Sequence, residues 1–146
     1  MISIKTIHTF DTYAIRHLVL REGLPLQTCF FKNDTANNTK HYGAYLENEL
    51  IGVVSVYEES CTQLKSSLQF QVRGMAVLDK FQKKGVGKKL IEHILTEYKS
   101  DKKNTIWLNS REEAIPFYKK NNFSEIGTIF VNETNIPHKV MFQEIK

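Results

Sequence analysis

Hydrophobic and polar residues follow two different periods in the middle of the chain. From residue 68 to residue 73 every second residue is apolar, which is typical of a strand with one buried face. From residue 86 to residue 98 apolar residues recur about every four positions, which predicts an amphipathic helix. Gly74 interrupts the first pattern, so we expect a bulge there or the close approach of another backbone. The middle of the chain therefore predicts a strand, a turn and a helix in succession.

Shorter patterns predict the flanking elements. Helices are expected within residues 11–27, in two pieces broken at Gly23 and Pro25. A polar stretch at residues 32–40 is short enough for a surface loop. Further strands are expected at residues 2–7, in a hairpin over residues 42–57 that turns at Glu47, Asn48 and Glu49, and at residues 123–132 and 138–145. This order is that of a mixed α/β protein.

The helix expected after residue 110 carries two local signals. Ser110 and Glu113 form a Ser-x-x-Glu sequence, which predicts a capping box for a helix beginning near Arg111. Pro116 would then lie inside that helix, so a kink or a delayed start is expected. Asn122 follows the helix and is a suitable residue for the left-handed conformation of a C-cap.

Composition narrows the class of protein. With 146 residues, 41% of them hydrophobic, the chain is expected to form a single domain over residues 1–146. Its two cysteines, Cys29 and Cys61, do not form a disulfide framework, and no histidine has the spacing of a zinc ligand pair, so no metal is expected. The sequence shows neither a membrane span nor the apolar region of a signal peptide, and a reducing cytoplasm is the expected compartment.

The turn Gln-Lys-Lys-Gly-Val-Gly at residues 82–87 is the strongest functional signal. Unpaired N–H groups and the helix dipole meet where such a turn opens a helix, and together they favour a phosphate or pyrophosphate. A Walker loop is excluded because no Ser or Thr follows Lys88, and a dinucleotide fingerprint is excluded because Leu90 stands where a third glycine is needed. Five lysines flank the glycines: Lys80, Lys83, Lys84, Lys88 and Lys89.

Two sequence blocks resemble the GNAT superfamily of N-acetyltransferases. Residues 77–87 are similar to its acetyl-CoA-binding motif, Gln/Arg-x-x-Gly-x-Gly/Ala, with Gln82, Gly85 and Gly87 at the defining positions. Residues 106–123 are similar to its next motif, in which Asn109 would end a strand and Phe117-Tyr118 would lie on a helix. Two motifs in the right order are far more specific than either alone. The segments before and after these two blocks resemble a bacterial branch of the superfamily, for which the reaction is better defined than the substrate.

The resemblance implies a fold and a set of site residues. The fold is a mixed, mostly antiparallel sheet of about seven strands with a splayed fourth strand, flanked by about four helices. In the superfamily a backbone N–H, here that of Val77, polarises the thioester carbonyl, and a tyrosine, here Tyr118, protonates the sulfur. The implied acetyl-CoA-binding residues are Met75, Ala76, Val77, Gln82, Lys83, Lys84, Gly85, Val86, Gly87, Lys88, Asn109, Phe117 and Tyr118.

The general base is left open between several groups. Gln69 and Gln71 stand where many relatives carry a glutamate, and neither can take a proton. His138 is the first choice, because its reference pKa of about 6.5 suits proton transfer. The other candidates are Glu58, Glu59, Glu133, His41 and a water chain without a dedicated base.

The expected function is transfer of an acetyl group from acetyl-CoA to a primary amine, with a small molecule as acceptor. The alternatives are acetylation of a protein lysine or N-terminus, and a non-catalytic acyl-CoA sensor. The net charge of +4 lies mainly around the glycine turn, and no aromatic-interleaved basic stripe accompanies it, so neither nucleic acid nor a membrane is an expected partner. Self-association as a homodimer stays open.

Overall fold

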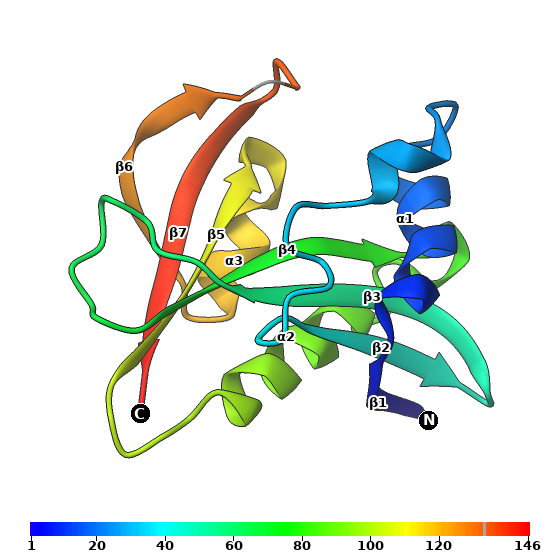
Figure 1. Ribbon diagram of the computed structural model, residues 1–146, viewed down its shortest axis with the longest axis horizontal. Coiled ribbons are helices and arrows are strands. Elements are labelled where there is room, and N and C mark those ends of the chain that lie inside the picture. Colours follow the sequence, from blue (N-terminus) through cyan, green and yellow to red (C-terminus); the bar gives the residue numbers. More distant parts are fainter. Residues whose placement is uncertain (133) are drawn as a thin grey trace. The chain divides into compact units, whose positions relative to one another are not determined.

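The computed structural model describes residues 1–132 and 134–146, and its elements follow the expected order (Figure 1). The strands are β1 (Ile2–Ile7), β2 (Lys40–Leu46), β3 (Glu49–Glu58), β4 (Gln69–Val77), β5 (Asn104–Arg111), β6 (Ser124–Val131) and β7 (Pro137–Ile145). The α-helices are α1 (Tyr13–Leu20), α2 (Val86–Glu97) and α3 (Ile115–Lys120). The hydrogen-bonded strand order is β1-β2-β3-β4-β5-β7-β6. The expected mixed sheet of about seven strands is therefore confirmed.

The chain divides into two compact units. The first unit comprises Met1–Tyr57 and Val72–Thr96, and the second comprises Glu58–Gln71 and Glu97–Lys146. Strand β4 contributes its first three residues to the second unit and the others to the first unit.

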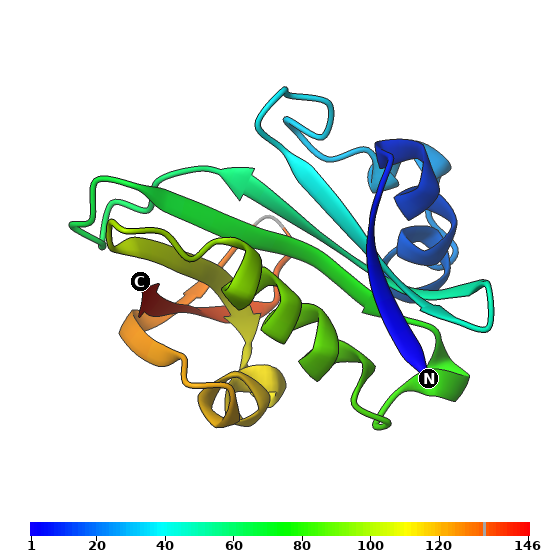
Figure 2. The ribbon, with the colours of Figure 1, turned by 90° about the horizontal axis from the view of Figure 1, so that it is seen from below.

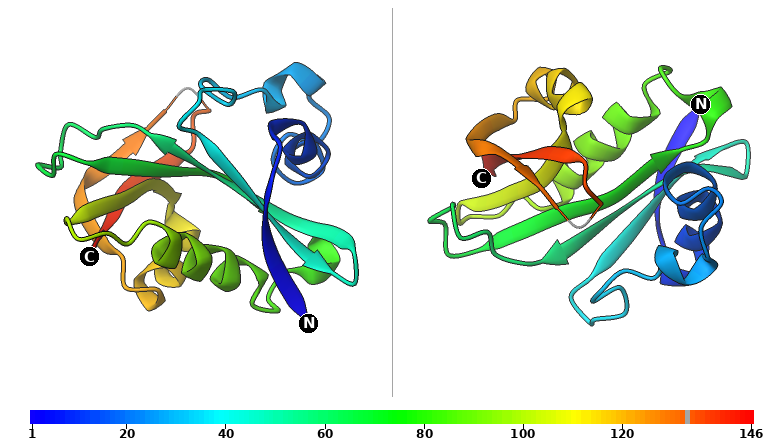
Figure 3. Two further views of the ribbon diagram at one scale, coloured as in Figure 1. Left: turned by 60° about the horizontal axis from the view of Figure 1, so that its bottom comes forward. Right: turned by 90° about the horizontal axis from the view of Figure 1, so that it is seen from above.

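In the first unit, α1 and α2 lie on opposite faces of strands β2, β3 and β4 (Figures 2 and 3). The hairpin between β2 and β3 turns as expected, because Glu47 and Asn48 both have positive φ, at 48° and 70°. Helix α2 buries the apolar stripe anticipated from its period: Val86, Leu90, Ile91 and Ile94.

In the second unit, the start of β4 pairs in parallel with β5 from Gln69–Thr105 to Gln71–Trp107. Strand β7 lies between β5 and β6 and is antiparallel to both (Figure 1). The parallel pairing ends after three residue pairs, in agreement with the expected splay of the fourth strand.

Helix α3 starts late, as Pro116 predicted, because proline is tolerated only in the first turn of a helix. Its C-terminus is closed by two hydrogen bonds of 3.0 Å, from Asn122 N–H to the Lys119 carbonyl and from Phe123 N–H to the Tyr118 carbonyl. Asn122 has φ of 71°, so the predicted left-handed C-cap is confirmed.

Two local predictions were wrong. Ser110 forms no capping box: it remains in β5, paired with Lys139, and its hydroxyl donates to the Arg111 carbonyl at 2.8 Å. The pairing with β7 therefore outweighs the local capping signal. The second helical piece expected before residue 27 is instead a 3-10 turn at Leu26–Cys29 that follows Pro25, so the described residues form three α-helices where about four were expected.

None of the helices in the described part of the chain has both the length and the hydrophobicity needed to span a membrane.

Candidate active site

Strand β4 changes conformation at Gly74, where the sequence pattern breaks. Gly74 has φ of +67°, and a Cβ atom at this position would lie 2.9 Å from Cε2 of Phe31. Only glycine satisfies both constraints readily, because other residues rarely adopt this φ and the Cβ atom would overlap the ring. The group that approaches β4 at Gly74 is thus a phenylalanine side chain, where the sequence predicted either a bulge or the close approach of another backbone.

Val77 ends β4 with its N–H group directed away from β3. The neighbouring Leu78 N–H donates to the Ile51 carbonyl of β3 at 2.9 Å, and successive N–H groups along a strand point to opposite edges. The Val77 carbonyl lies on the same edge as its N–H and accepts a hydrogen bond from Nε2 of Gln82 at 2.9 Å. This arrangement directs the Val77 N–H away from the ladder that joins β3 and β4.

The glycine turn that follows has the backbone geometry of an anion site. Lys83 and Gly85 have positive φ, at 61° and 84°, and nothing lies within 4 Å of a Cβ atom built on Gly85. The first helical hydrogen bond of α2 runs from Lys89 N–H to the Gly85 carbonyl at 3.1 Å, so the N–H groups before it have no helical acceptor. Lysine side chains around this turn are exposed: Lys83, Lys84 and Lys88.

The remaining candidates lie in the second unit. Asn109 is exposed on β5, next to Val140 of β7. Tyr118 is buried on α3, with its ring centre 5.0 Å from that of Phe117 and 5.7 Å from that of Phe123. Burial raises the pKa of the Tyr118 phenol to about 12, so this side chain stays protonated at neutral pH.

His138 lies near the start of β7, opposite Arg111 of β5, and its ring stacks on Phe130 at 6.0 Å. Nδ1 of His138 is 2.7 Å from the Ile136 carbonyl oxygen. Because a carbonyl can only accept, Nδ1 carries the proton in the neutral ring and Nε2 keeps its lone pair. In this tautomer Nε2 is the nitrogen that can accept a proton.

The structure thus places the candidates in two groups. Met75, Ala76, Val77 and the turn residues 82–88 belong to the first unit, and Asn109, Phe117, Tyr118 and His138 belong to the second. Of the other proposed bases, Glu58 and Glu59 are exposed at the end of β3, and Glu133 lies outside the described residues.

A comparison with known proteins decides the family. The model of the acetyltransferase (GNAT) domain matches residues 26–143. This chain belongs to the GNAT acetyltransferase family. The uncharacterized N-acetyltransferase YitI of Bacillus subtilis (strain 168) is 30% identical over 150 residues, which cover 100% of this chain and 98% of the relative. The resemblance seen in the two sequence motifs is therefore confirmed, and the chain is an acyltransferase.

Solved structures agree on the fold of this acetyltransferase. ElaA of Escherichia coli superposes with a TM-score of 0.74 at 17% identity, covering 98% of this chain and 99% of its own. An aminoglycoside 6'-N-acetyltransferase complexed with coenzyme A superposes with a TM-score of 0.74 at 13% identity. The superposition covers 99% of this chain and 97% of the aminoglycoside acetyltransferase.

The first unit of the acetyltransferase also contains a buried ion pair that the sequence did not reveal. Arg16 of α1 is fully buried, and its Nη1 lies 2.7 Å from Oδ2 of Asp34. The carboxylate also accepts hydrogen bonds from Tyr57 Oη at 2.6 Å and from the Phe31 N–H at 2.8 Å. Burial alone would raise the pKa of Asp34, but these hydrogen bonds and the Arg16 charge outweigh it and hold the pKa below its usual value. The pair is therefore charged, and both carboxylate oxygens of Asp34 and both terminal nitrogens of Arg16 are hydrogen-bonded.

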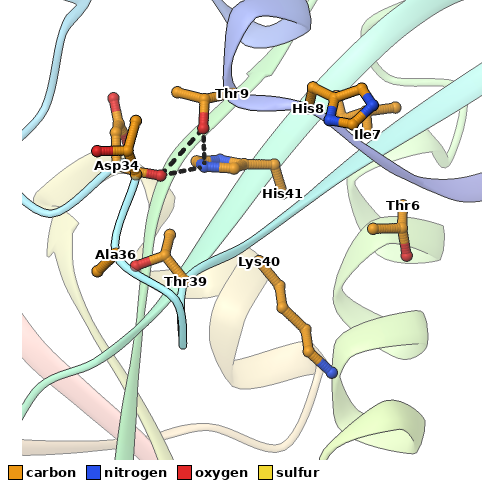
Figure 4. Close-up of a pocket in the computed structure, with 10 residues that line it drawn as sticks. Thr6, Ile7, His8, Thr9, Asp34, Ala36, Thr39, Lys40 and His41 are labelled. Carbon is orange, nitrogen blue, oxygen red and sulfur yellow. Dashed lines mark hydrogen bonds between the residues drawn. The ribbon is translucent and has the colours of Figure 1, made fainter.

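His41 extends this network to the edge of a polar hollow of about 260 Å³ (Figure 4). Its Nε2 lies 2.8 Å from the Asp34 carbonyl and 3.0 Å from Thr9 Oγ1, and its Nδ1 lies 2.6 Å from Ser55 Oγ. Since the carbonyl accepts, Nε2 is the donor and Nδ1 accepts from Ser55. Both nitrogens are occupied, so the geometry favours a structural role for His41 over that of a general base.

We expect His41 to make the stability of the protein depend on pH. Burial lowers the pKa of His41 below its ordinary value of 6.5, so the unfolded chain takes up the proton more readily than the folded one. The stabilisation is complete above this ordinary value and is lost as the pH falls from it toward the folded pKa. Urea unfolding between about pH 7 and pH 5 should show this loss, and His41→Gln should reduce the slope.

The matched control is His8→Gln, which removes an exposed histidine beside the same hollow. An identical slope for wild type and His41→Gln would contradict the assignment.

Among residues 1–132 and 134–146, no group of three or more His, Cys, Asp or Glu side chains is arranged to hold a metal ion.

Proposed function

We propose that this acetyltransferase transfers the acetyl group of acetyl-CoA to a primary amine of a small molecule, by direct attack of the amine on the thioester. The observation that carries the proposal is the order of two hydrogen-bonding features along the chain, one at the end of β4 and one at the start of α2. The Val77 N–H points away from β3, and nine residues later α2 begins with unpaired N–H groups among exposed lysines. The two features fit a carbonyl and a pyrophosphate of one extended molecule.

The residues of this turn fit the acetyl-CoA pyrophosphate on two grounds. Gly85 leaves open space where a side chain would stand, and its positive φ, like that of Lys83, is typical of turns whose backbone N–H groups bind anions. Lys83, Lys84 and Lys88 supply positive charge around it. Gln82 has a supporting role in this account, because its amide bonds to the Val77 carbonyl and to Oδ1 of Asp79 at 3.2 Å.

In the proposed reaction the amine nitrogen forms a bond to the acetyl carbon, and the bond from that carbon to sulfur breaks. The Val77 N–H stabilises the negative charge that develops on the carbonyl oxygen. The amine loses a proton, which Nε2 of His138 is suited to accept because its Nδ1 is the donor to Ile136. Tyr118, which stays protonated, stabilises the charge on the departing sulfur by hydrogen bonding.

Complete proton transfer from Tyr118 to sulfur is uphill, because its pKa of about 12 exceeds that of a thiol, which is about 8.5. We therefore assign Tyr118 as a hydrogen-bond donor that keeps its proton, so that coenzyme A leaves as a thiolate and takes a proton from solvent. This role depends on the hydroxyl alone.

Tyr118→Phe should lower kcat by about 10- to 100-fold, because one hydrogen bond to a developing charge is lost. The dissociation constant of acetyl-CoA should change little, since the ring packing against Phe117 and Phe123 is kept. Steady-state kinetics together with calorimetric titration measures both quantities. Tyr98→Phe is the matched control, because Tyr98 is another buried tyrosine of the second unit. An unaltered kcat for Tyr118→Phe would remove Tyr118 from the mechanism.

The acceptor class is tested by comparing small amines with peptides under identical conditions. Thiol release from acetyl-CoA should be faster with members of a small-amine panel than with lysine-containing peptides or free peptide N-termini. Preference for peptides would establish a protein acetyltransferase. Binding of acetyl-CoA without thiol release in either set would establish an acyl-CoA sensor.

A further inference from the structure

Three arginines surround one aromatic ring in the first unit. The guanidinium carbons of Arg16, Arg73 and Arg21 lie 4.0, 5.2 and 5.4 Å from the centre of the Phe31 ring. Each distance is within the range of a cation–π interaction. Three like charges around one ring repel each other, and a negative charge nearby would offset this repulsion.

The Asp34 carboxylate is near this ring, but its hydrogen bonds are already taken by Arg16, Tyr57 and the Phe31 N–H. Both oxygens of Asp34 are bonded to Arg16, and they also accept from Tyr57 and from the Phe31 N–H. Within residues 1–132 and 134–146, neither Arg21 nor Arg73 forms an ion pair with a carboxylate. Two positive charges at this ring are thus uncompensated by the described residues.

Arg73 is held in a way that suits recognition of an anion. Its guanidinium lies 5.2 Å from the Phe31 ring and 5.2 Å from the Tyr57 ring, so the two rings limit its motion. Stacking leaves the N–H groups at the edge of a guanidinium available, and these bind carboxylate and phosphate in a forked geometry. Arg21 is also partly anchored, because its Nη1 donates to the Leu20 carbonyl at 3.0 Å.

Arg73 lies on the strand that is proposed to hold the acetyl group, whereas Arg21 follows the C-terminal end of α1. Arg73 immediately precedes Gly74, and Val77 follows on the same strand at most about 14 Å away between Cα atoms. A single small molecule can span this distance with an amine at one end and a negatively charged group at the other.

We infer that the acceptor amine carries an anionic group, a carboxylate or a phosphate, which Arg73 and Arg21 bind over the Phe31 ring. The inference rests on the proposed acetyl transfer and adds the class of the acceptor. It assigns Arg73 and Arg21 as specificity-determining residues that act on substrate binding and take no part in proton transfer.

The test uses amines in matched pairs with acetyl-CoA. The probes are glycine and glycinamide, 6-aminohexanoate and its amide, and glucosamine 6-phosphate and glucosamine. The anionic member of at least one pair should have a kcat/KM at least about tenfold higher than its neutral partner. Arg73→Gln should lower kcat/KM for that anionic amine by about 10- to 100-fold, mainly through KM, and change the neutral partner little.

The controls separate anion binding from packing. Arg73→Lys keeps the charge without the fork and should retain part of the activity, whereas Arg21→Gln should act in the same direction as Arg73→Gln. Lys5→Gln removes a positive charge that lies over another ring of the first unit, that of Tyr45, and should have no effect. Equal loss with anionic and neutral amines would show that Arg73 only packs, and preference for the neutral partners would likewise overturn the inference.

Failure of the proposed transfer is distinguishable from failure of this inference. If no probe is acetylated, each probe is titrated calorimetrically into the protein in the presence of coenzyme A. Arg73-dependent binding of an anionic probe would then support the recognition site while the transfer proposal fails. Absence of such binding would overturn the inference itself.

Discussion

Arg16→Met should lower the free energy of unfolding by about 3–5 kcal/mol. Arg16 and Asp34 are 0% and 6% exposed, so the substitution leaves a buried carboxylate without its counter-charge. It also removes hydrogen bonds from the arginine to the Cys29 carbonyl and to Ser55 Oγ, at 2.8 and 2.9 Å. Urea denaturation monitored by circular dichroism at neutral pH measures the change.

Three control variants locate the cause of this loss. Tyr57→Phe removes a hydrogen bond to Asp34 and one from Arg16 and should cost about 1–3 kcal/mol. Lys103→Met breaks an exposed ion pair with Glu144 and should cost about 0–1 kcal/mol. Combining Arg16→Met with Asp34→Asn should recover part of the stability, because no buried charge is then left unpaired. A loss no larger than that of Lys103→Met would contradict the account of the buried pair.

Gly85→Glu should weaken acetyl-CoA binding at least about 100-fold, because it places a carboxylate beside the pyrophosphate in the proposed site. Gly85 is exposed and nothing lies within 4 Å of its Cβ position, so no packing is disturbed. Isothermal titration with acetyl-CoA measures the affinity. Retained affinity would remove this turn from the acetyl-CoA site.

Gly23→Glu is the matched control for Gly85→Glu. Gly23 has φ of +79°, against +84° for Gly85, and it too has nothing within 4 Å of its Cβ position. Both substitutions therefore carry a similar backbone cost, about 1–2 kcal/mol, and add the same charge to the same unit. Only the change at Gly85 should affect acetyl-CoA binding.

The parts of the site that depend on local sequence could be predicted. The strand before Gly74, the turn at residues 82–87 and α2 follow from alternation, glycine and a helical period, all within one segment of 30 residues or fewer. The left-handed Asn122 was predictable for the same reason, because the conformation of a C-cap depends on a single residue type.

The parts that depend on distant pairing could not be predicted. Residues 32–40 were interpreted as a surface loop, and most of them are exposed, but Asp34 turns inward because Arg16 offers it a buried partner 18 positions earlier. An arginine in an amphipathic helix gives no signal that distinguishes a buried from an exposed position. The arginines around Phe31 come from α1, its C-terminal end and β4, and only the folded chain brings them together.

Ser110 shows how tertiary structure overrides a local signal. Its Ser-x-x-Glu sequence favours a helix start, yet the pairing of β5 with β7 continues through Arg111 and keeps Ser110 extended. A sheet of several paired residues contributes more than one capping interaction.

The most direct test of the account is acetyl transfer itself. Wild-type protein is incubated with acetyl-CoA and a panel of primary amines, and free thiol and N-acetylated product are quantified in the same sample. The account predicts equal amounts of thiol and N-acetyl product for at least one amine, with both lost in Gly85→Glu and retained in Gly23→Glu. Acetyl-CoA binding without N-acetyl product from any amine or peptide would contradict it.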